Sequence, residues 1–344
     1  MIHFQCDYAQ GCHPLLLERL VAANLTSHPG YGLDGCCDSA RSRIREACRQ
    51  PHADVHFLSG GTQANLIAIS ACLKSYQGVL AADTGHIACH ETGAIEATGH
   101  KVLPLPAPDG ILSACQIREA CRIHYSSPTR EHTVQPGMVY ISLPTECGTL
   151  YTCAQLEALH SCCQELGLLL YIDGARLGYG LTSPANDLTL ADVASLCDLF
   201  YIGGTKCGAL LGEALVIVND ALKPDFRYAI KQRGGMLAKG WLLGLAFDAL
   251  FTDGLYFTIC RQANEYALAI RSALERKAIP LGYDSYTNQQ FPILTPRQLA
   301  CLQPKYVWEP WQAFPDGRQM VRFCTSWATT QQQAEALIAD ILLL

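Results

Sequence analysis

Two short apolar runs near the middle of the chain constrain its fold more than any other feature. The first, LLLYID, ends at Asp173, and the second, DLFYIGGTK, reaches Lys206 after a glycine turn. A short continuous apolar run is typical of a strand that is buried on both faces of a parallel sheet. Ligands bind at the carboxyl ends of strands in open α/β sheets, so we expect the Asp173 carboxylate and the Lys206 amine to meet at one sheet edge.

The wider pattern is an alternation of strand-like and helix-like segments over most of the chain. It predicts an α/β fold with a mostly parallel sheet of about seven strands and helices on both faces. A long helix over Tyr256–Lys277 then leads into three strand-like segments and a final helix. We therefore expect an N-terminal arm (1–15), a large domain (16–252) and a smaller α/β C-terminal domain (253–344).

The composition is that of a globular protein with a sizeable core. Of the 344 residues, 49% are hydrophobic and 16% are charged, which excludes a disordered chain. The net charge of −6 comes without a basic block, so no nucleic-acid partner is expected. No apolar run is expected to span a membrane, and the N-terminus MIHFQCDYAQ lacks the pattern of a signal peptide. These features predict a cytoplasmic protein.

The chain contains 18 cysteines, an unusual number that invites a disulfide or metal interpretation. Their spacing does not support either one, because there is no Cys-x-x-Cys motif, only adjacent pairs such as Cys162–Cys163 and scattered single residues. Most of them stand where Ala or Val would serve, and a free cysteine packs as a small hydrophobic residue. The sequence thus predicts structural thiols in a reducing compartment and no metal site.

A lysine and a carboxylate at one sheet edge suit pyridoxal phosphate. The lysine forms a Schiff base with this cofactor, and the carboxylate keeps the pyridine nitrogen protonated so that the ring can accept electrons. Taken singly, Asp173 also fits a turn residue and Lys206 a surface lysine. Because each follows a predicted strand, the pair favours the cofactor.

The segment SGGTQAN lies between a predicted strand and a predicted helix. Glycines allow a ligand to approach the backbone closely, and the free N–H groups of a helix start bind anions such as phosphate. Gly61, Thr62 and Gln63 are therefore candidates for the cofactor's phosphate, although a plain glycine turn with Thr62 as helix cap fits equally well. The segment is neither a Walker loop nor a dinucleotide fingerprint.

Three further residues are candidates for the same site. His86 follows a predicted strand end, where an imidazole can stack on the pyridine ring or move protons, or simply be structural. Arg176 lies on the turn after Asp173. Arg322 lies in an otherwise apolar strand, and a buried arginine needs an anionic partner, which is either a substrate carboxylate or an acidic residue of the chain.

In combination and in this order, these motifs resemble the fold-type I pyridoxal-phosphate enzymes of the threonine aldolase and β-eliminating lyase group. The resemblance covers nearly the whole chain and is carried by GGTQAN, TGHI…HETGA, IDGARLG, GGTK and MVRF. It implies that Lys206 carries the internal aldimine, Asp173 pairs with the pyridine nitrogen and His86 stacks on the ring. It also implies that Gly61, Thr62 and Gln63 bind the phosphate, together with Thr205. Arg176 and Arg322 would contact the cofactor oxygen and the substrate carboxylate.

The resemblance also extends to the arm and to the subunit arrangement. Cys6 stands where the family commonly has a serine that contacts the substrate carboxylate, and Asp7 follows it. The stretch KQRGGM…AKG resembles a segment near a neighbouring subunit's active site, which implies that Lys231 and Lys239 act across subunits. The family's active sites lie between subunits, so the resemblance implies a homodimer or homotetramer.

The function implied by the resemblance is retro-aldol cleavage of L-3-hydroxy-amino acids, such as threonine or allo-threonine, to glycine and an aldehyde. His86 is the candidate base for the hydroxyl proton. Three alternatives remain open: a β-eliminating lyase that releases ammonia and an oxo acid, a transaminase, and a cofactor binder without activity. In the β-eliminating lyase, Lys206 would take the Cα proton.

Overall fold

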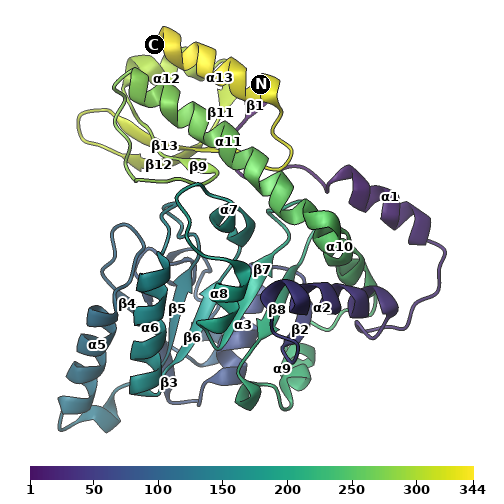
Figure 1. The fold of residues 1–344 in the computed structure, drawn as a ribbon. Coiled ribbons are helices and arrows are strands. Elements are labelled where there is room, and N and C mark those ends of the chain that lie inside the picture. Colours follow the sequence, from purple (N-terminus) through teal and green to yellow (C-terminus); the bar gives the residue numbers. More distant parts are fainter.

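The computed structural model describes all 344 residues, and its body is one seven-stranded sheet (Figure 1). The five neighbouring strands β4, β3, β5, β6 and β7 run parallel to one another, whereas β8 is antiparallel to both β7 and β2. This arrangement confirms the predicted mostly parallel sheet. In spatial order the strands are β2 (Asp54–Leu58), β8 (Glu213–Ile217), β7 (Leu199–Gly203), β6 (Leu169–Asp173), β5 (Gln135–Ser142), β3 (Gln77–Ala82) and β4 (Val102–Leu105).

Helices cover both faces of this sheet, which explains why its strands are continuously apolar. Successive side chains of a strand point to opposite faces. In β6, Leu170 and Ile172 belong to one core cluster, whereas Tyr171 belongs to the cluster on the other face. The first face is covered by α2 (Gly35–Cys48), α5 (Ala114–Ser126), α6 (Cys153–Leu166), α8 (Leu190–Ser195) and α10 (Trp241–Phe251). The second is covered by α3 (Gly61–Cys72) and α9 (Phe226–Gln232).

A smaller layer follows the long helix α11 (Leu255–Arg276), which confirms the helix predicted there. It contains a small antiparallel sheet with its own apolar core (Figure 1). The chain's first strand pairs in parallel with β11, so the arm lies against this layer. Its elements are β1 (Ile2–His3), β9 (Gln289–Gln290), β10 (Ile293–Leu294), α12 (Pro296–Leu302), β11 (Tyr306–Val307), β12 (Glu309–Ala313), β13 (Gln319–Cys324) and α13 (Gln331–Leu343). Helix α12 is an addition to the predicted order, and the domain boundaries stay a prediction.

Two helices begin before the residue that the sequence suggests as their cap, which is Asp38 in the segment DSARSRIREACRQ and Thr62 in SGGT. Helix α2 begins at Gly35, because the Oδ1 atom of Asp34, not Asp38, accepts a hydrogen bond of 2.9 Å from the N–H group of Cys37. Helix α3 begins at Gly61 with Gly60 as its cap, so Thr62 lies inside its first turn. The DGCCD segment offers two aspartates for this role, and their spacing alone does not choose between them. In SGGT the cap is a glycine, which has no side chain to mark the position.

The expectation about membrane-spanning length also needs correction. The stretch Trp241–Arg276 has the length and the hydropathy, 1.4 in its most apolar window, of a membrane span. Half of that window is buried inside the protein, and Asp253 breaks the helix with a φ of 50°. Because α10 packs against α2, α1 (Pro14–Ala23) and the sheet, the stretch is explained as a core element.

The close packing of α2 on α10 generates a prediction about stability. A Cβ atom on Gly244 would lie 2.6 Å from the Cα atom of Cys37, which is backbone and cannot move aside. We predict that Gly244→Ala lowers the free energy of unfolding by about 1–3 kcal/mol, because it forces the two helices apart. Urea unfolding measures the loss.

The matched control is Gly35→Ala, at the start of α2, where a Cβ atom meets nothing within 4 Å. This variant should be neutral or stabilised by up to about 1 kcal/mol, because alanine restricts the unfolded chain. Equal losses of stability in both variants would show that the close α2–α10 contact is not the reason why alanine is destabilising at position 244.

Candidate active site

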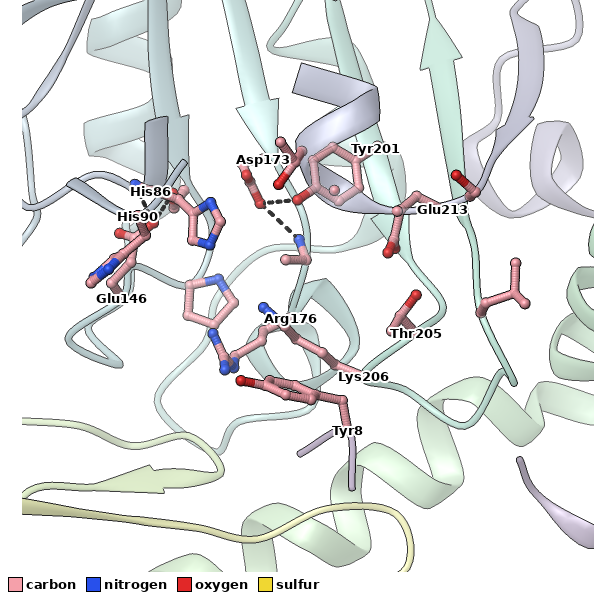
Figure 2. A pocket seen from close by; sticks show the side chains of 18 of the residues that line it. Tyr8, His86, His90, Glu146, Asp173, Arg176, Tyr201, Thr205, Lys206 and Glu213 are labelled. Atoms are coloured by element: carbon pink, nitrogen blue, oxygen red, sulfur yellow. Dashed lines mark hydrogen bonds between the residues drawn. The ribbon is translucent and has the colours of Figure 1, made fainter. Parts of the chain in front are cut away.

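A cavity of about 490 Å³ opens at the carboxyl ends of the central strands (Figure 2). Asp173 is the last residue of β6, and Lys206 follows β7 after a glycine turn, as the sequence predicted. A Cβ atom on Gly174 would lie 1.9 Å from the carbonyl oxygen of Tyr201, so the glycine lets these two strand ends converge. The predicted residues that line the cavity are Gly61, Thr62, His86, Asp173, Arg176, Thr205, Lys206 and Arg322.

Two predicted residues do not line the cavity. The Gln63 side chain instead accepts hydrogen bonds of 3.2 and 2.9 Å from the backbone N–H and the hydroxyl of Ser59, which fixes the glycine turn. Cys6 lies outside the cavity wall, whereas Tyr8, two residues further along the arm, forms part of it. The arm therefore reaches the site through a residue other than the one predicted.

The Asp173 carboxylate is buried and accepts four hydrogen bonds. Its Oδ1 atom accepts bonds from the Tyr201 hydroxyl (2.5 Å) and the Ala175 N–H (3.0 Å), and its Oδ2 atom from the Tyr140 hydroxyl (2.6 Å) and the Asn65 amide (3.1 Å). Burial raises the pKa of Asp173, but the charge of His86 and the hydrogen bonds that Asp173 accepts together lower this pKa by more, so the net shift is downward. Asp173 therefore stays ionised at neutral pH.

His86 begins the short helix α4 (His86–Cys89) and is held by an acid. Its Nδ1 atom lies 2.7 Å from Oε1 of Glu91, which also accepts a 2.7 Å hydrogen bond from the Asn65 amide. Burial opposes a charge on the imidazole, but the bond to Glu91 and the charge of Asp173 raise the pKa of His86 overall. This network fixes the ring's orientation and places a proton on Nδ1.

Lys206 faces the same cavity and is prepared to act as an amine (Figure 2). Burial, followed by the charge of Arg176, lowers the pKa of Lys206 below its usual value. Burial also raises the pKa of its neighbour Glu213 to about 7. A lysine that loses its proton more readily is a better nucleophile toward a carbonyl group.

The two predicted arginines have different surroundings. Arg176 donates hydrogen bonds of 2.7 and 3.1 Å to the two carboxylate oxygens of Asp7, which also accepts a 3.0 Å bond from the Asn288 amide. Arg322 has no acidic partner, because its terminal nitrogens donate only to Gln289 and to the Gln5 carbonyl. Its Nε atom is buried without any partner. Arg322 is therefore the arginine that is free to bind an anion.

Sequence reasoning missed several residues of the cavity wall. Tyr140 and Tyr201, which donate hydrogen bonds to Asp173, lie on the two strands that flank β6. The sequence did contain a signal for them, because the segments MVYIS, LLYID and LFYIG each carry a tyrosine at the same position. His90 was visible in HETGA beside His86, but the helical continuation of that segment left its direction open. Other residues carry no local signal, because they come from distant segments. The missed wall residues include Tyr8, His90, Glu146, Tyr201, Glu213, Glu309 and Trp311.

The Asp7–Arg176 pair generates a prediction about stability. Both residues are buried, so Asp7→Asn leaves the charge of Arg176 without a counterion. We predict a loss of about 3–5 kcal/mol in the free energy of unfolding, measured with urea at neutral pH. Burial raises the pKa of Asp7, but the charges of Arg176, Lys206 and Arg322 and the hydrogen bonds from Arg176 together outweigh burial, so the net shift is downward. The pair's stabilisation is therefore fully present above the usual aspartate range and is lost only as pH falls through the depressed pKa.

The matched control is Asp38→Asn in the exposed pair with Arg41, where the acid's side chain is 71% exposed. This change should cost less than about 1 kcal/mol, because water screens the pair. A similar small loss for Asp7→Asn would contradict the assigned role of the buried pair.

Comparisons with known proteins agree with this geometry. The model of the family described as beta-eliminating lyase matches residues 7–296. The low specificity L-threonine aldolase of a Pseudomonas species is 30% identical over 98% of this chain and 96% of its own length, and that of Pseudomonas aeruginosa is 29% identical over 99% and 97%. The solved structure of Leishmania major threonine aldolase is 47% identical, with a TM-score of 0.97 over 99% of this chain and 98% of that one.

The likeness in fold extends to more distant enzymes. A mutant aspartate aminotransferase of Thermus thermophilus superimposes with a TM-score of 0.72 at 14% identity, over 100% of this chain and 91% of its own. At that identity the match shows the fold alone. Together with the family match, it confirms the predicted fold and class: the chain is a fold-type I pyridoxal-phosphate enzyme that belongs to the beta-eliminating lyase family.

Proposed function

We propose that the protein is a pyridoxal-phosphate-dependent aldehyde-lyase that cleaves L-threonine and L-allo-threonine to glycine and acetaldehyde. The observation that carries the proposal is one cavity in which a lysine of lowered pKa, an ionised Asp173 and an unpaired Arg322 face each other. The three relatives with 29–47% identity are all named threonine aldolases.

The residues present fit pyridoxal phosphate. The backbone N–H groups at the start of α3 face the cavity without a side-chain cap, and a Cβ atom on Gly61 would lie 3.0 Å from the Tyr201 hydroxyl. This bare helix start would hold the phosphate, with Thr62 and Thr205 beside it. Asp173 would pair with the pyridine nitrogen, and Lys206 would hold the cofactor covalently through Nζ. When bound, the cofactor supplies an electron sink for the pair released as the substrate's Cα–Cβ bond breaks.

Arg322 is our candidate for the substrate carboxylate. Its guanidinium lines the cavity, it lacks an acidic partner, and its Nε–H is unsatisfied. A carboxylate bound there would satisfy a buried donor and gain a charge-assisted hydrogen bond. Arg176 is already paired with Asp7, so it is assigned to positioning of the arm and to the cofactor oxygen.

The proton acceptor for the substrate hydroxyl is assigned to His90 in preference to His86. The two rings lie 5.7 Å apart, and both line the cavity. The pKa of His86 is raised, so its imidazole tends to be charged, which suits ring stacking and orientation better than proton removal. Burial, then the charges of His86 and Arg322, lower the pKa of His90. A neutral imidazole at physiological pH can accept a proton.

The assembly proposed is a homodimer or homotetramer, with small amino acids as substrates. Large apolar side chains are exposed beside the cavity, among them Leu210 (54%) and Leu211 (40%), and Leu211 also lines it. Lys231 lies 4.8 Å from the ring of Tyr31 within its own chain, so its predicted role across subunits stays a prediction, as does that of Lys239. The cytoplasmic location also stays a prediction.

The proposed activity predicts the products. Purified protein with pyridoxal phosphate and L-allo-threonine should release glycine and acetaldehyde in equal amounts, because the substrate loses its Cα–Cβ bond and keeps its amino group. Lys206→Ala should abolish turnover, and Lys223→Ala, whose lysine bonds to the His52 carbonyl, is the matched control that should retain it. Ammonia with an oxo acid and no glycine would establish β-elimination instead, and transfer of the amino group to an added oxo acid would establish a transaminase.

The assignment of His90 predicts a separate defect. His90→Asn should lower kcat by about 10²-fold or more and leave KM and cofactor absorbance unchanged, because it removes only the proton acceptor. In the wild type, kcat should fall as pH drops through the lowered pKa of His90, and the variant should lose this limb of the pH profile. An unchanged kcat in His90→Asn, with a large loss in His86→Asn, would return the role to His86.

A further inference from the structure

A second group of chemically active residues lies away from the cavity wall, where the loop between α1 and α2 meets two helix starts. His28 lies in that loop, and its ring stacks on Trp241, the first residue of α10, at 4.6 Å. Asp34 caps α2, and Cys36 lies in the first turn of that helix. One ligand atom from each of His28, Asp34 and Cys36 lies within 4.8 Å of the other two.

Two polar atoms in this group are buried and have no hydrogen-bond partner. Asp34 is only 1% exposed, and although its Oδ1 atom accepts the N–H of Cys37 at 2.9 Å, its Oδ2 atom is unpaired. The Nε2 atom of His28 is likewise buried and unpaired. Buried polar atoms are nearly always satisfied, so these two point to a ligand that both can bind.

We propose that His28, Asp34 and Cys36 form a binding site for zinc or a similar divalent transition metal. An imidazole nitrogen, a carboxylate oxygen and a thiolate are the donor types that zinc prefers, with water as a fourth ligand. Magnesium and calcium are disfavoured, since they take oxygen ligands and several of them. Zinc ligands stand roughly 3.5 Å apart, so the ligand atoms, which lie within 4.8 Å of one another, need to approach by at most about 1.3 Å.

The electrostatics of the site agree with this donor set. The starts of α2 and α10 carry partial positive charge, which favours the anionic form of Asp34 that a metal requires. The two negative ligands balance a divalent cation. The nearby carboxylate of Asp248 is already bound by Arg19 and Arg43, so it does not compete. Burial, then Asp34 and Asp248, raise the pKa of the Cys36 thiol, and a bound metal would displace that proton.

The metal would tie a long loop to the helix pair below it. The segment between α1 and α2 contains no regular structure, and Tyr31 and Gly32 within it have φ angles of 62° and 73°. Coordination by His28 would fix this segment to the start of α2, beside the tight Gly244–Cys37 contact with α10. The site is therefore structural and independent of the proposed lyase chemistry. Residue spacing hides it, because its three ligands form no known metal motif.

The test is zinc binding by the full-length chain loaded with pyridoxal phosphate. After equilibrium dialysis against ZnCl₂, the wild type should retain one zinc per chain more than Cys36→Ser and His28→Gln. Cobalt should give the visible ligand-field bands of a tetrahedral site with a sulfur ligand in the wild type and not in these two variants. The melting temperature should rise with zinc concentration in the wild type and not in the two variants, because ligands stabilise the state they bind.

The matched control is Cys153→Ser. Cys153 is also a partly exposed thiol in the first turn of a helix, with a carboxylate oxygen of Glu157 3.8 Å away, but it belongs to no three-ligand group. This variant should bind zinc as the wild type does. Circular dichroism and unchanged aldolase activity establish that each variant is folded. Equal zinc content in all four proteins, or none on the wild type, would overturn the proposal.

Discussion

The buried carboxylate of Asp173 is the group on which the rest of the site depends. Four donors surround it, from strands β5 and β7, from helix α3 and from the turn after β6. An ionised carboxylate inside a protein is tolerated only when it is paired or fully hydrogen-bonded. These bonds tie β5, β6, β7 and α3 together at one edge, and Asn65 extends the network through Glu91 to His86. A cofactor would therefore enter a site whose charges are already placed.

A second buried charge connects this edge to the smaller layer. Asp7 comes from the arm, Arg176 from the turn after Asp173, and Asn288 from the segment before β9. Their hydrogen bonds hold three distant parts of the chain together, and they satisfy Arg176 without a ligand. Arg322 comes from β13 and lacks such a partner. The contrast between the two arginines is what distinguishes a positioning role from a substrate-binding role.

The sequence predicted the features that follow from local patterns. The two apolar runs delivered Asp173 and Lys206 to one sheet edge, and the glycine segment lies at the start of a helix, as predicted. Contacts between distant segments were not predictable in this way. Nothing in the sequence pairs Asp7 with Arg176, places Tyr8 instead of Cys6 at the cavity, or unites His28 with Cys36. The cap of α2 was misjudged because Asp34 and Asp38 both fit the role, and that of α3 because a glycine fills it.

Lys206, facing an ionised Asp173, is the residue proposed to hold the cofactor. Borohydride reduction of the loaded protein makes such a bond permanent, and peptide mass spectrometry then locates the pyridoxyl group. We expect one label per chain, on the peptide that contains Lys206. A label on another lysine, such as Lys231 or Lys239, or no label on a protein that cleaves L-allo-threonine, would contradict it.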